Sequence, residues 1–137
     1  MTATAGSSGL QPLEPLRRSW AVLLKSRKRD GDWVGTPVNL VVDGERAYFG
    51  TPAKSAKVKR LRNFDTVELA PCTLRGRPTG AVVVARARLL DDEETTRALA
   101  HLRRKHPIVY RLLVPVELRL KRTHGVYYEL DRFEPAS

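Results

Sequence analysis

Apolar and β-branched runs separated by short polar breaks extend through most of the chain and predict a mainly β protein. Asp30-Gly31 and Asp43-Gly44 interrupt the first runs, and an Asp-Gly pair between apolar runs is a strong hairpin signal. The segment "DTVELAPCTL" then alternates apolar and polar positions, as a half-buried strand does. The pattern predicts strands at about 19–28, 33–42, 46–50, 65–74, 79–90 and 125–135, the first three in an antiparallel meander.

Two segments carry helix start and stop signals. "TPAKSAKVKRLRNF" at 51–64 offers Thr51 as the N-cap, Pro52 at the first helical position and Asn63 near the end. "DDEETTRALAHLRRKHP" at 91–107 begins with acids and ends with basic residues, an order that complements the helix dipole. We predict a helix in both segments.

The segment "IVYRLLVPVELRLKR" at 108–122 is ambiguous. The spacing of Ile108, Leu112 and Val116 favours a helix, whereas Pro115 would kink a helix and would be poorly tolerated in a central strand. We predict a helix here. All the elements together predict a mainly β (α+β) fold, a small antiparallel barrel with helices packed at its ends or rim.

The ends of the chain and its length indicate one domain. Residues 1–14 are small, polar or helix-breaking and are predicted to form a flexible N-terminal tail before a single folded domain at 15–137. The longest apolar runs fall well short of the ~20 residues that a spanning helix needs. The first residues also lack the basic and apolar regions of a secretory signal. We therefore expect a soluble, cytoplasmic protein.

Net charge is the unusual property of the composition. The chain has 25 Lys and Arg against 15 Asp and Glu, a formal charge of +10, so an anionic partner is expected. Nucleic acid, an anionic membrane and a phosphorylated small molecule all fit that charge. Nucleic-acid binding is supported by the charge alone, because only 7% of the residues are aromatic and a single-strand platform needs exposed aromatic side chains.

Motifs of common catalytic and metal sites are missing from the sequence. Cys72 is the single cysteine, so it forms no internal disulfide or Cys-based metal cluster. His101 and His106 are five residues apart, a spacing that points them to different faces of a helix. No Gly-x-Ser-x-Gly, Gly-x-Gly-x-x-Gly or Walker motif occurs. We predict no metal site and assign no catalytic residue.

The basic segment at 51–64 is the candidate site that remains. Its cations either form a solvated face around buried Val58 and Leu61, or they hold an anion. Lys54, Lys57 and Arg60 are spaced three apart and would lie on one side of a helix, within reach of one ligand. Amide groups at a helix start also favour an anion, and charge-assisted hydrogen bonds contribute roughly 1.5–3 kcal/mol each. We predict a phosphate cradle.

A longer stretch carries a family resemblance. Residues 35–80, "GTPVNLVVDGERAYFGTPAKSAKVKRLRNFDTVELAPCTLRGRPTG", resemble the coenzyme F420-dependent branch of the pyridoxamine 5′-phosphate oxidase-like split-β-barrel flavoproteins. The shared order is a Thr-Pro-Val strand, an Asp-Gly turn, an aromatic strand, then "SAKVKRLR" and "VELAPC". Two segments depart from the family pattern: the long basic approach "SRKRDGDWVGTPV", and the interruption of the second helical region by Pro115.

The resemblance implies a homodimer that binds a deazaflavin or flavin between two barrels. It implies a cofactor phosphate on the helix at 54–60 and a ring along the backbone of the strand at 36–42. The implied cofactor-binding residues are Pro37, Val38, Asn39, Thr51, Lys54, Ser55, Ala56, Lys57 and Arg60. Surplus cations, among them Arg75 and Arg77, are candidates to attract the coenzyme's glutamate tail, although each could equally be a screened surface charge.

The function implied is an oxidoreductase, an F420H2-dependent reductase that transfers a hydride to a small conjugated or quinone-like acceptor. In such enzymes the cofactor carries the chemistry and the protein supplies orientation and exclusion of water. The resemblance identifies neither the acceptor nor a proton donor. Two alternatives stay open: use of FMN or haem in the same groove, and a non-catalytic protein that binds or sequesters its cofactor.

Overall fold

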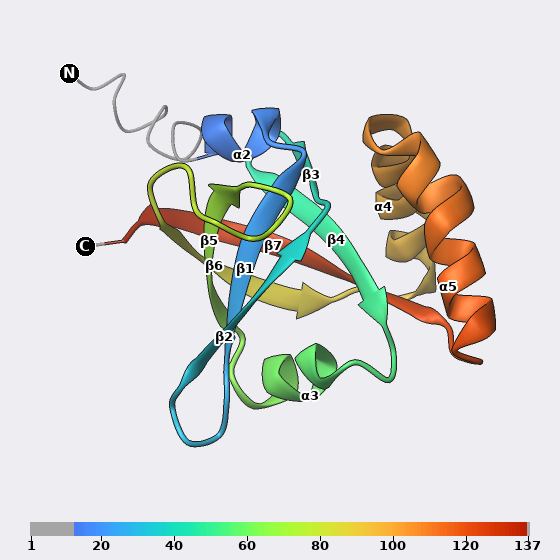
Figure 1. Cartoon of the computed structure of the whole chain (residues 1–137), viewed down its shortest axis with the longest axis horizontal. Coiled ribbons are helices and arrows are strands. Elements are labelled where there is room, and N and C mark those ends of the chain that lie inside the picture. The colour runs from blue at the N-terminus through green and yellow to red at the C-terminus, as the bar shows by residue number, and fades with distance from the viewer. Residues whose placement is uncertain (1–12, 137) are drawn as a thin grey trace.

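Seven antiparallel strands form one continuous sheet that curls into a split barrel (Figure 1). The structure is a computed structural model, and it describes residues 13–136. The strand order across the sheet is β2-β1-β5-β6-β7-β4-β3. The strands are β1 (Ala21–Arg27), β2 (Trp33–Val38), β3 (Val41–Asp43), β4 (Arg46–Pro52), β5 (Thr66–Cys72), β6 (Val83–Leu89) and β7 (Gly125–Pro135). The predicted mainly β barrel class is confirmed.

Both predicted Asp-Gly hairpins are present. Gly31 has φ 97° in the turn between β1 and β2, and Gly44 has φ 63° in the turn between β3 and β4. This left-handed backbone suits glycine, which has no Cβ to clash.

The single strand predicted at 33–42 is wrong, because it is two strands at opposite edges of the sheet. β2 pairs with β1, whereas β3 pairs with β4, and the chain changes partner at Asn39 and Leu40. Leu40 is 1% exposed inside the barrel, and the Tyr110 hydroxyl donates to the Asn39 carbonyl at 2.7 Å. The buried side chain and this hydrogen bond hold the change of direction.

The barrel interior is the main core. Apolar side chains from all seven strands meet there, and the largest of the fully buried ones is Phe49. A second core lies between the helices and the sheet, where Leu102 and Tyr110 pack with Val41 and Tyr127. This second core involves the helical segments after residue 90, whereas Leu16 and Leu61 of the two earlier helices pack in the main core.

Four α-helices and one π-helical turn accompany the sheet within residues 13–136. They are α2 (Glu14–Arg18), α3 (Ala56–Asn63), α4 (Asp92–Lys105), η2 (Val109–Leu113) and α5 (Val114–Leu120). α4 confirms the prediction for 91–107, and a reciprocal capping box between Asp91 and Glu94 begins it. None of these helices is long and apolar enough to cross a membrane.

The sequence pattern did not predict α2. Leu13 and Leu16 are at most 1% exposed and join the barrel core. The described fold thus includes residues 13 and 14, which the predicted tail contained. Residues 1–12 of that tail lie outside the described part of the chain.

The helix predicted at 108–122 is confirmed, with a π-helical first half. Pro115 lies at the start of α5, directly after η2. Proline is tolerated at the beginning of a helix because its missing N–H has no partner to lose there. The π-helical turn η2 changes the hydrogen-bond register of the helix, so α5 begins a new α-helix within a continuous helical segment.

The predicted start of the helix at 51–64 is wrong. Thr51 and Pro52 end β4, where they pair with Val126 and Gly125 of β7. The N-cap is Ser55, whose Oγ accepts a hydrogen bond from the Lys57 amide at 3.1 Å. Pairing with β7 extends the strand past a good local cap, and the next suitable residue takes that role.

Candidate anion-binding site

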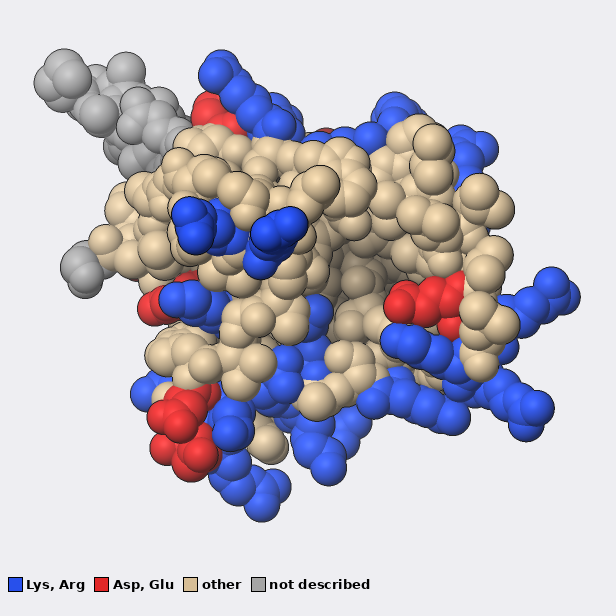
Figure 2. All heavy atoms as spheres, viewed as in Figure 1, with Lys and Arg blue, Asp and Glu red and all other residues tan. Residues whose placement is uncertain are grey.

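α3 and the β1–β2 hairpin lie at the same end of the molecule, and a groove lies between them (Figure 1). Its volume is about 580 Å³. Lys28, Arg29, Val34, Ala56, Lys59, Arg60 and Asn63 line it, and this set contains four cations and no acid. We call it the cationic groove. Figure 2 shows Lys and Arg side chains gathered at this end of the molecule.

An aromatic contact fixes the hairpin against the end of α3. The Arg27 guanidinium lies 5.4 Å from the ring centre of Trp33 on β2 and 5.7 Å from that of Phe64, the C-cap of α3. A cation over two rings gains from both ring quadrupoles. The contact joins β1, β2 and α3, the three elements that form the groove.

Arg60 is the anchored cation of the groove. Its Nε donates to Ser26 Oγ at 2.7 Å, and Ser26 is fully buried on β1. The described residues give its two Nη atoms no hydrogen-bond partner or carboxylate. A guanidinium held in this way can present two parallel N–H groups to a phosphate or carboxylate with little further loss of side-chain freedom.

Lys57 is a buried cation without a described counter-ion. It is 8% exposed, and no described carboxylate pairs with it. Burial, and to a smaller extent the charge of Arg60, lowers its pKa from 10.5 to about 8. Burying an unpaired charge costs stability, and perturbed groups of this kind are common at binding sites. An anion beside Lys57 and Arg60 would supply the missing charge.

The other residues predicted around the start of the helix have more limited roles. Lys54 is exposed and precedes α3, whereas Ala56 lines the cationic groove. Ser55 already accepts the Lys57 amide as N-cap. Lys54, Lys57 and Arg60 therefore do not share one helical face as predicted, because Lys54 precedes α3, whereas Lys57 and Arg60 lie three residues apart on it.

The strand predicted to lie along the cofactor ring has few side chains that are free to contact a ligand. Val38 is buried in the barrel core, and Asn39 Nδ2 donates to the Trp20 carbonyl at 2.8 Å. Pro37 is exposed beside the loop at 73–77, where a Cβ on Gly76 would lie 3.3 Å from Pro37 Cγ. That the backbone of this strand faces a cofactor ring stays a prediction.

Thr51 lies in a different place from the cationic groove. It is 6% exposed and lines a crevice of about 40 Å³ with Glu117 of α5 and Tyr127 of β7. A Cβ on Gly50 would lie 2.8 Å from Tyr127 Cδ2, so glycine at that position leaves room for the ring. Within this chain the predicted residues are thus distributed over the groove, the β2 end and this crevice.

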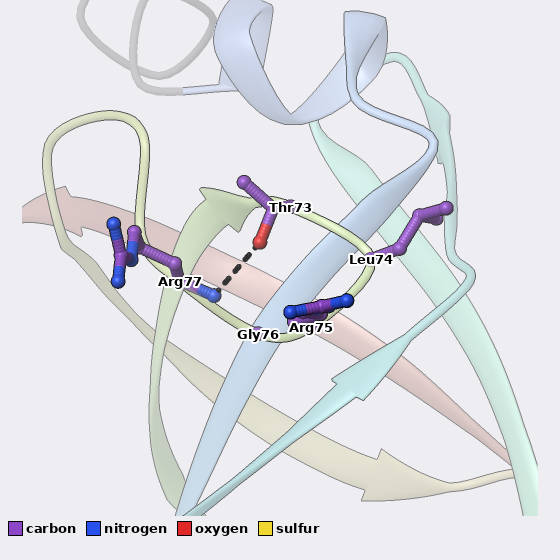
Figure 3. A pocket seen from close by; sticks show the side chains of 5 residues that line it. All are labelled: Thr73, Leu74, Arg75, Gly76 and Arg77. Carbon is purple, nitrogen blue, oxygen red and sulfur yellow. Dashed lines mark hydrogen bonds between the residues drawn. The ribbon is translucent and has the colours of Figure 1, made fainter.

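A second basic feature is the loop at 73–77 (Figure 3). Thr73, Leu74, Arg75, Gly76 and Arg77 line a cavity of about 740 Å³. Thr73 Oγ1 accepts a hydrogen bond from the Arg77 amide at 3.1 Å, and this closes the turn. Both arginines are exposed and project from the loop, which lies against Pro37. They are positioned to attract an anion near the end of β2.

Sequence reasoning missed Lys28, Arg29 and Lys59 as site residues. The signal for Lys28 and Arg29 was the unusually basic approach "SRKRDGDW", and Lys59 belongs to the basic segment at 51–64. Sequence does not show which side of the sheet the hairpin tip faces. Only the packing of α3 on β1 places Lys28 and Arg29 beside Arg60.

Histidine, cysteine and acidic side chains form no group suited to a metal within residues 13–136. His106 is 2% exposed, its Nε2 donates to the Leu40 carbonyl at 3.0 Å, and burial lowers its pKa. Cys72 is buried, and burial raises the pKa of its thiol. Both side chains are therefore part of the packed interior.

No family model matches the sequence, and no curated protein matches it either. Solved structures do match. An F420 reductase is 15% identical, with 91% of this chain and 93% of that chain covered and a TM-score of 0.56. A "putative pyridoxamine 5′-phosphate oxidase" from Listeria innocua is 16% identical over 89% and 90%, with a TM-score of 0.59. HutZ, the haem storage protein of Vibrio cholerae, is 12% identical over 91% of each chain, with a TM-score of 0.61.

At these identities the similarity shows the fold alone. The chain has the split-barrel fold that these proteins share, and oxidoreductases and cofactor-binding proteins both occur among them.

Proposed function

We propose that the protein binds coenzyme F420 and, as a homodimer, uses its reduced form to reduce a small conjugated or quinone-like acceptor. The observation that carries this proposal is the pair formed by buried Lys57 and anchored Arg60, which lacks a described counter-anion. The fold and the family resemblance of residues 35–80 support the same cofactor class.

The residues present suit a long polyanion with a flat ring. Arg60 and Lys57 would hold the phosphodiester, and Lys28, Arg29 and Lys59 would neutralise further negative charge along the cationic groove. The backbone at Pro37, Val38 and Asn39 would face the ring. When bound and reduced, the deazaflavin supplies the hydride. The chain's own contribution is to orient the ring, exclude water and neutralise the anionic portion of the coenzyme.

Fluorescence titration of the purified chain with the oxidised deazaflavin tests the proposal. We expect micromolar or tighter binding that weakens with added salt, because charges on the groove surface are screened. Lys57→Ala should weaken binding at least about tenfold, the value of one charge-assisted contact. No binding at low salt would end the proposal.

A carrier or sequestering protein is the second candidate, and the haem storage protein among the similar structures favours it. This candidate predicts binding of F420, FMN or haem without turnover. The absorbance spectrum of material that copurifies from a host making the deazaflavin identifies the ligand. A screen of conjugated and quinone acceptors with the reduced coenzyme then separates an enzyme, which oxidises it, from a carrier, which does not.

A further inference from the structure

The segment formed by η2 and α5 carries an exposed apolar face that no described part of the chain covers. Half of the ten large exposed apolar side chains found within residues 13–136 lie between 108 and 120. They are Ile108, Leu112, Leu113, Val116 and Leu120, which are between 48% and 78% exposed. The opposite side of the same segment packs on the second core through Tyr110. We call the exposed side the apolar stripe.

The stripe is continuous along the helical segment. Ile108, Leu112, Val116 and Leu120 are four residues apart, so they follow one ridge, with Leu113 beside it. Residues 109–120 form an unbroken run of helical turns despite Pro115. At 1.5 Å per residue, the stripe is about 18 Å long.

Cations accompany the stripe. Arg111, Arg119, Lys121 and Arg122 are exposed along or just after the segment, against one acid, Glu117. Glu117 is already paired with Lys121 at 3.2 Å. Figure 2 shows basic side chains projecting from the edge of the molecule where α5 lies. The exposed surface therefore combines apolar side chains with uncompensated positive charge.

We propose that the apolar stripe binds the surface of an anionic lipid bilayer. The apolar side chains would enter the boundary between headgroups and acyl chains, and the arginines would contact lipid phosphates, as in interfacial helices with basic flanks. The contact is independent of the cofactor proposal, because it uses none of the residues of the cationic groove.

A second copy of the chain fits this surface less well. The same segment of a second copy offers one acid, Glu117, to these cations, and Glu117 is already paired with Lys121. A stripe about 18 Å long and about 10 Å wide is also far smaller than the ~800 Å² that each partner buries in a stable interface. An anionic bilayer would offer acyl chains to the apolar side chains and lipid phosphates to the cations.

Sedimentation with lipid vesicles tests the proposal on the full chain. We expect the protein to bind vesicles of phosphatidylcholine mixed with phosphatidylglycerol, and not vesicles of phosphatidylcholine alone. The double variant Leu112→Glu/Leu120→Glu should lower the partition coefficient at least about tenfold, because it removes two apolar contacts and adds negative charge. Arg111→Gln/Arg119→Gln should lower it by about threefold or more.

Matched variants control for general effects of charge and exposure. Leu89→Glu alters a leucine of similar exposure on β6 (54%, against 57% for Leu112), and Arg17→Gln/Arg18→Gln removes two cations from α2. Both should bind vesicles as the unmodified chain does, and thermal unfolding should show that every variant is folded. Equal vesicle binding by Leu112→Glu/Leu120→Glu would overturn the proposal. So would light scattering that shows a dimer dissociated by that variant while the unmodified chain ignores anionic vesicles.

Discussion

Two charged regions of the molecule differ in how their charges are compensated. Between α4 and the sheet, Arg46, Arg88, Glu94 and Glu129 form a paired-charge cluster. Arg88 donates to both oxygens of Glu94, at 3.1 and 2.7 Å, and it also lies 3.4 Å from Glu129. Arg46 pairs with the other oxygen of Glu129 at 3.4 Å. The hydrogen bond from Arg88 is the main reason that the pKa of Glu94 falls to about 2.

The cationic groove shows the opposite arrangement. Four of its side chains are basic and none is acidic, and the charge of Arg60 also acts on buried Lys57, whose pKa it helps to lower. The paired cluster satisfies its own charges and joins a helix to the sheet, so it has little to offer a ligand. Among the described residues, Lys28 of the groove pairs with Asp30 at 3.9 Å, whereas Arg29, Lys59 and Arg60 have no described carboxylate partner and leave their charges to a ligand. The two regions should therefore respond differently to mutation.

The largest difference is expected for Arg60→Ala. Loss of the anchored guanidinium should weaken F420 binding about 10- to 100-fold, the range of one strong charge-assisted contact. Arg62→Ala is the matched control, because Arg62 is an exposed arginine of the same helix outside the groove. It should change affinity less than about twofold. Fluorescence titration at constant salt measures both, and equal losses would show that only overall charge matters.

Glu129→Gln should affect stability and leave ligand binding unchanged. The Glu129 side chain is 8% exposed and serves two arginines, so its loss should lower the free energy of unfolding by about 1.5–3 kcal/mol. Glu93→Gln, at an 85% exposed carboxylate paired with Arg97, should cost less than about 0.5 kcal/mol. Urea denaturation compares the two. A weakened F420 affinity in Glu129→Gln would contradict the view that the paired-charge cluster serves stability and the cationic groove serves binding.

Lys57→Met should raise the free energy of unfolding and remove the contribution of Lys57 to F420 binding. The folded pKa of Lys57 is about 8 against 10.5 for the free side chain, so between those values the unfolded state binds more protons. Stability of the unmodified chain should consequently rise with pH across that window. Lys57→Met should flatten this rise and add about 1–2 kcal/mol at pH 7, because it removes a buried unpaired charge.

Thermal or urea unfolding between pH 7 and about 10 measures this slope. Lys59→Met, at an exposed position of the same helix, is the control and should leave the slope as it is. A slope unchanged by Lys57→Met would mean that Lys57 has a partner in solution, and the contrast with the paired cluster would then fail.

The smallest effect is expected for Arg86→Ala. Arg86 pairs with Asp65 at 3.2 Å, but both side chains are about half exposed. An exposed pair contributes about 0.2–1 kcal/mol, so urea denaturation should show a change within that range. A larger loss would show that pairing stabilises this protein even without burial, and the account of Glu129 would need revision.

Local signals in the sequence were sufficient for much of the fold. The Asp-Gly turns, the helix from Asp92 to Lys105 and the strand alternation depend on residues a few positions apart, and the structure has each of them. The basic character of residues 54–62 was equally visible in the sequence. Propensity, capping and turn geometry act over such short distances, which is why they can be recognised without a fold.

Tertiary pairing decided the rest. Thr51, followed by Pro52, was a good local cap, yet β7 provides the backbone partners that keep it in β4. The chain between β2 and β3 has no breaking signal, yet the two strands pair at opposite edges of the sheet. Which cations form the groove was likewise settled by the packing of α3 on β1, because residues distant in sequence approach only when the sheet closes. Sequence determined that this protein is cationic and mainly β, and the closed sheet determined which of its positive charges remain without a described partner.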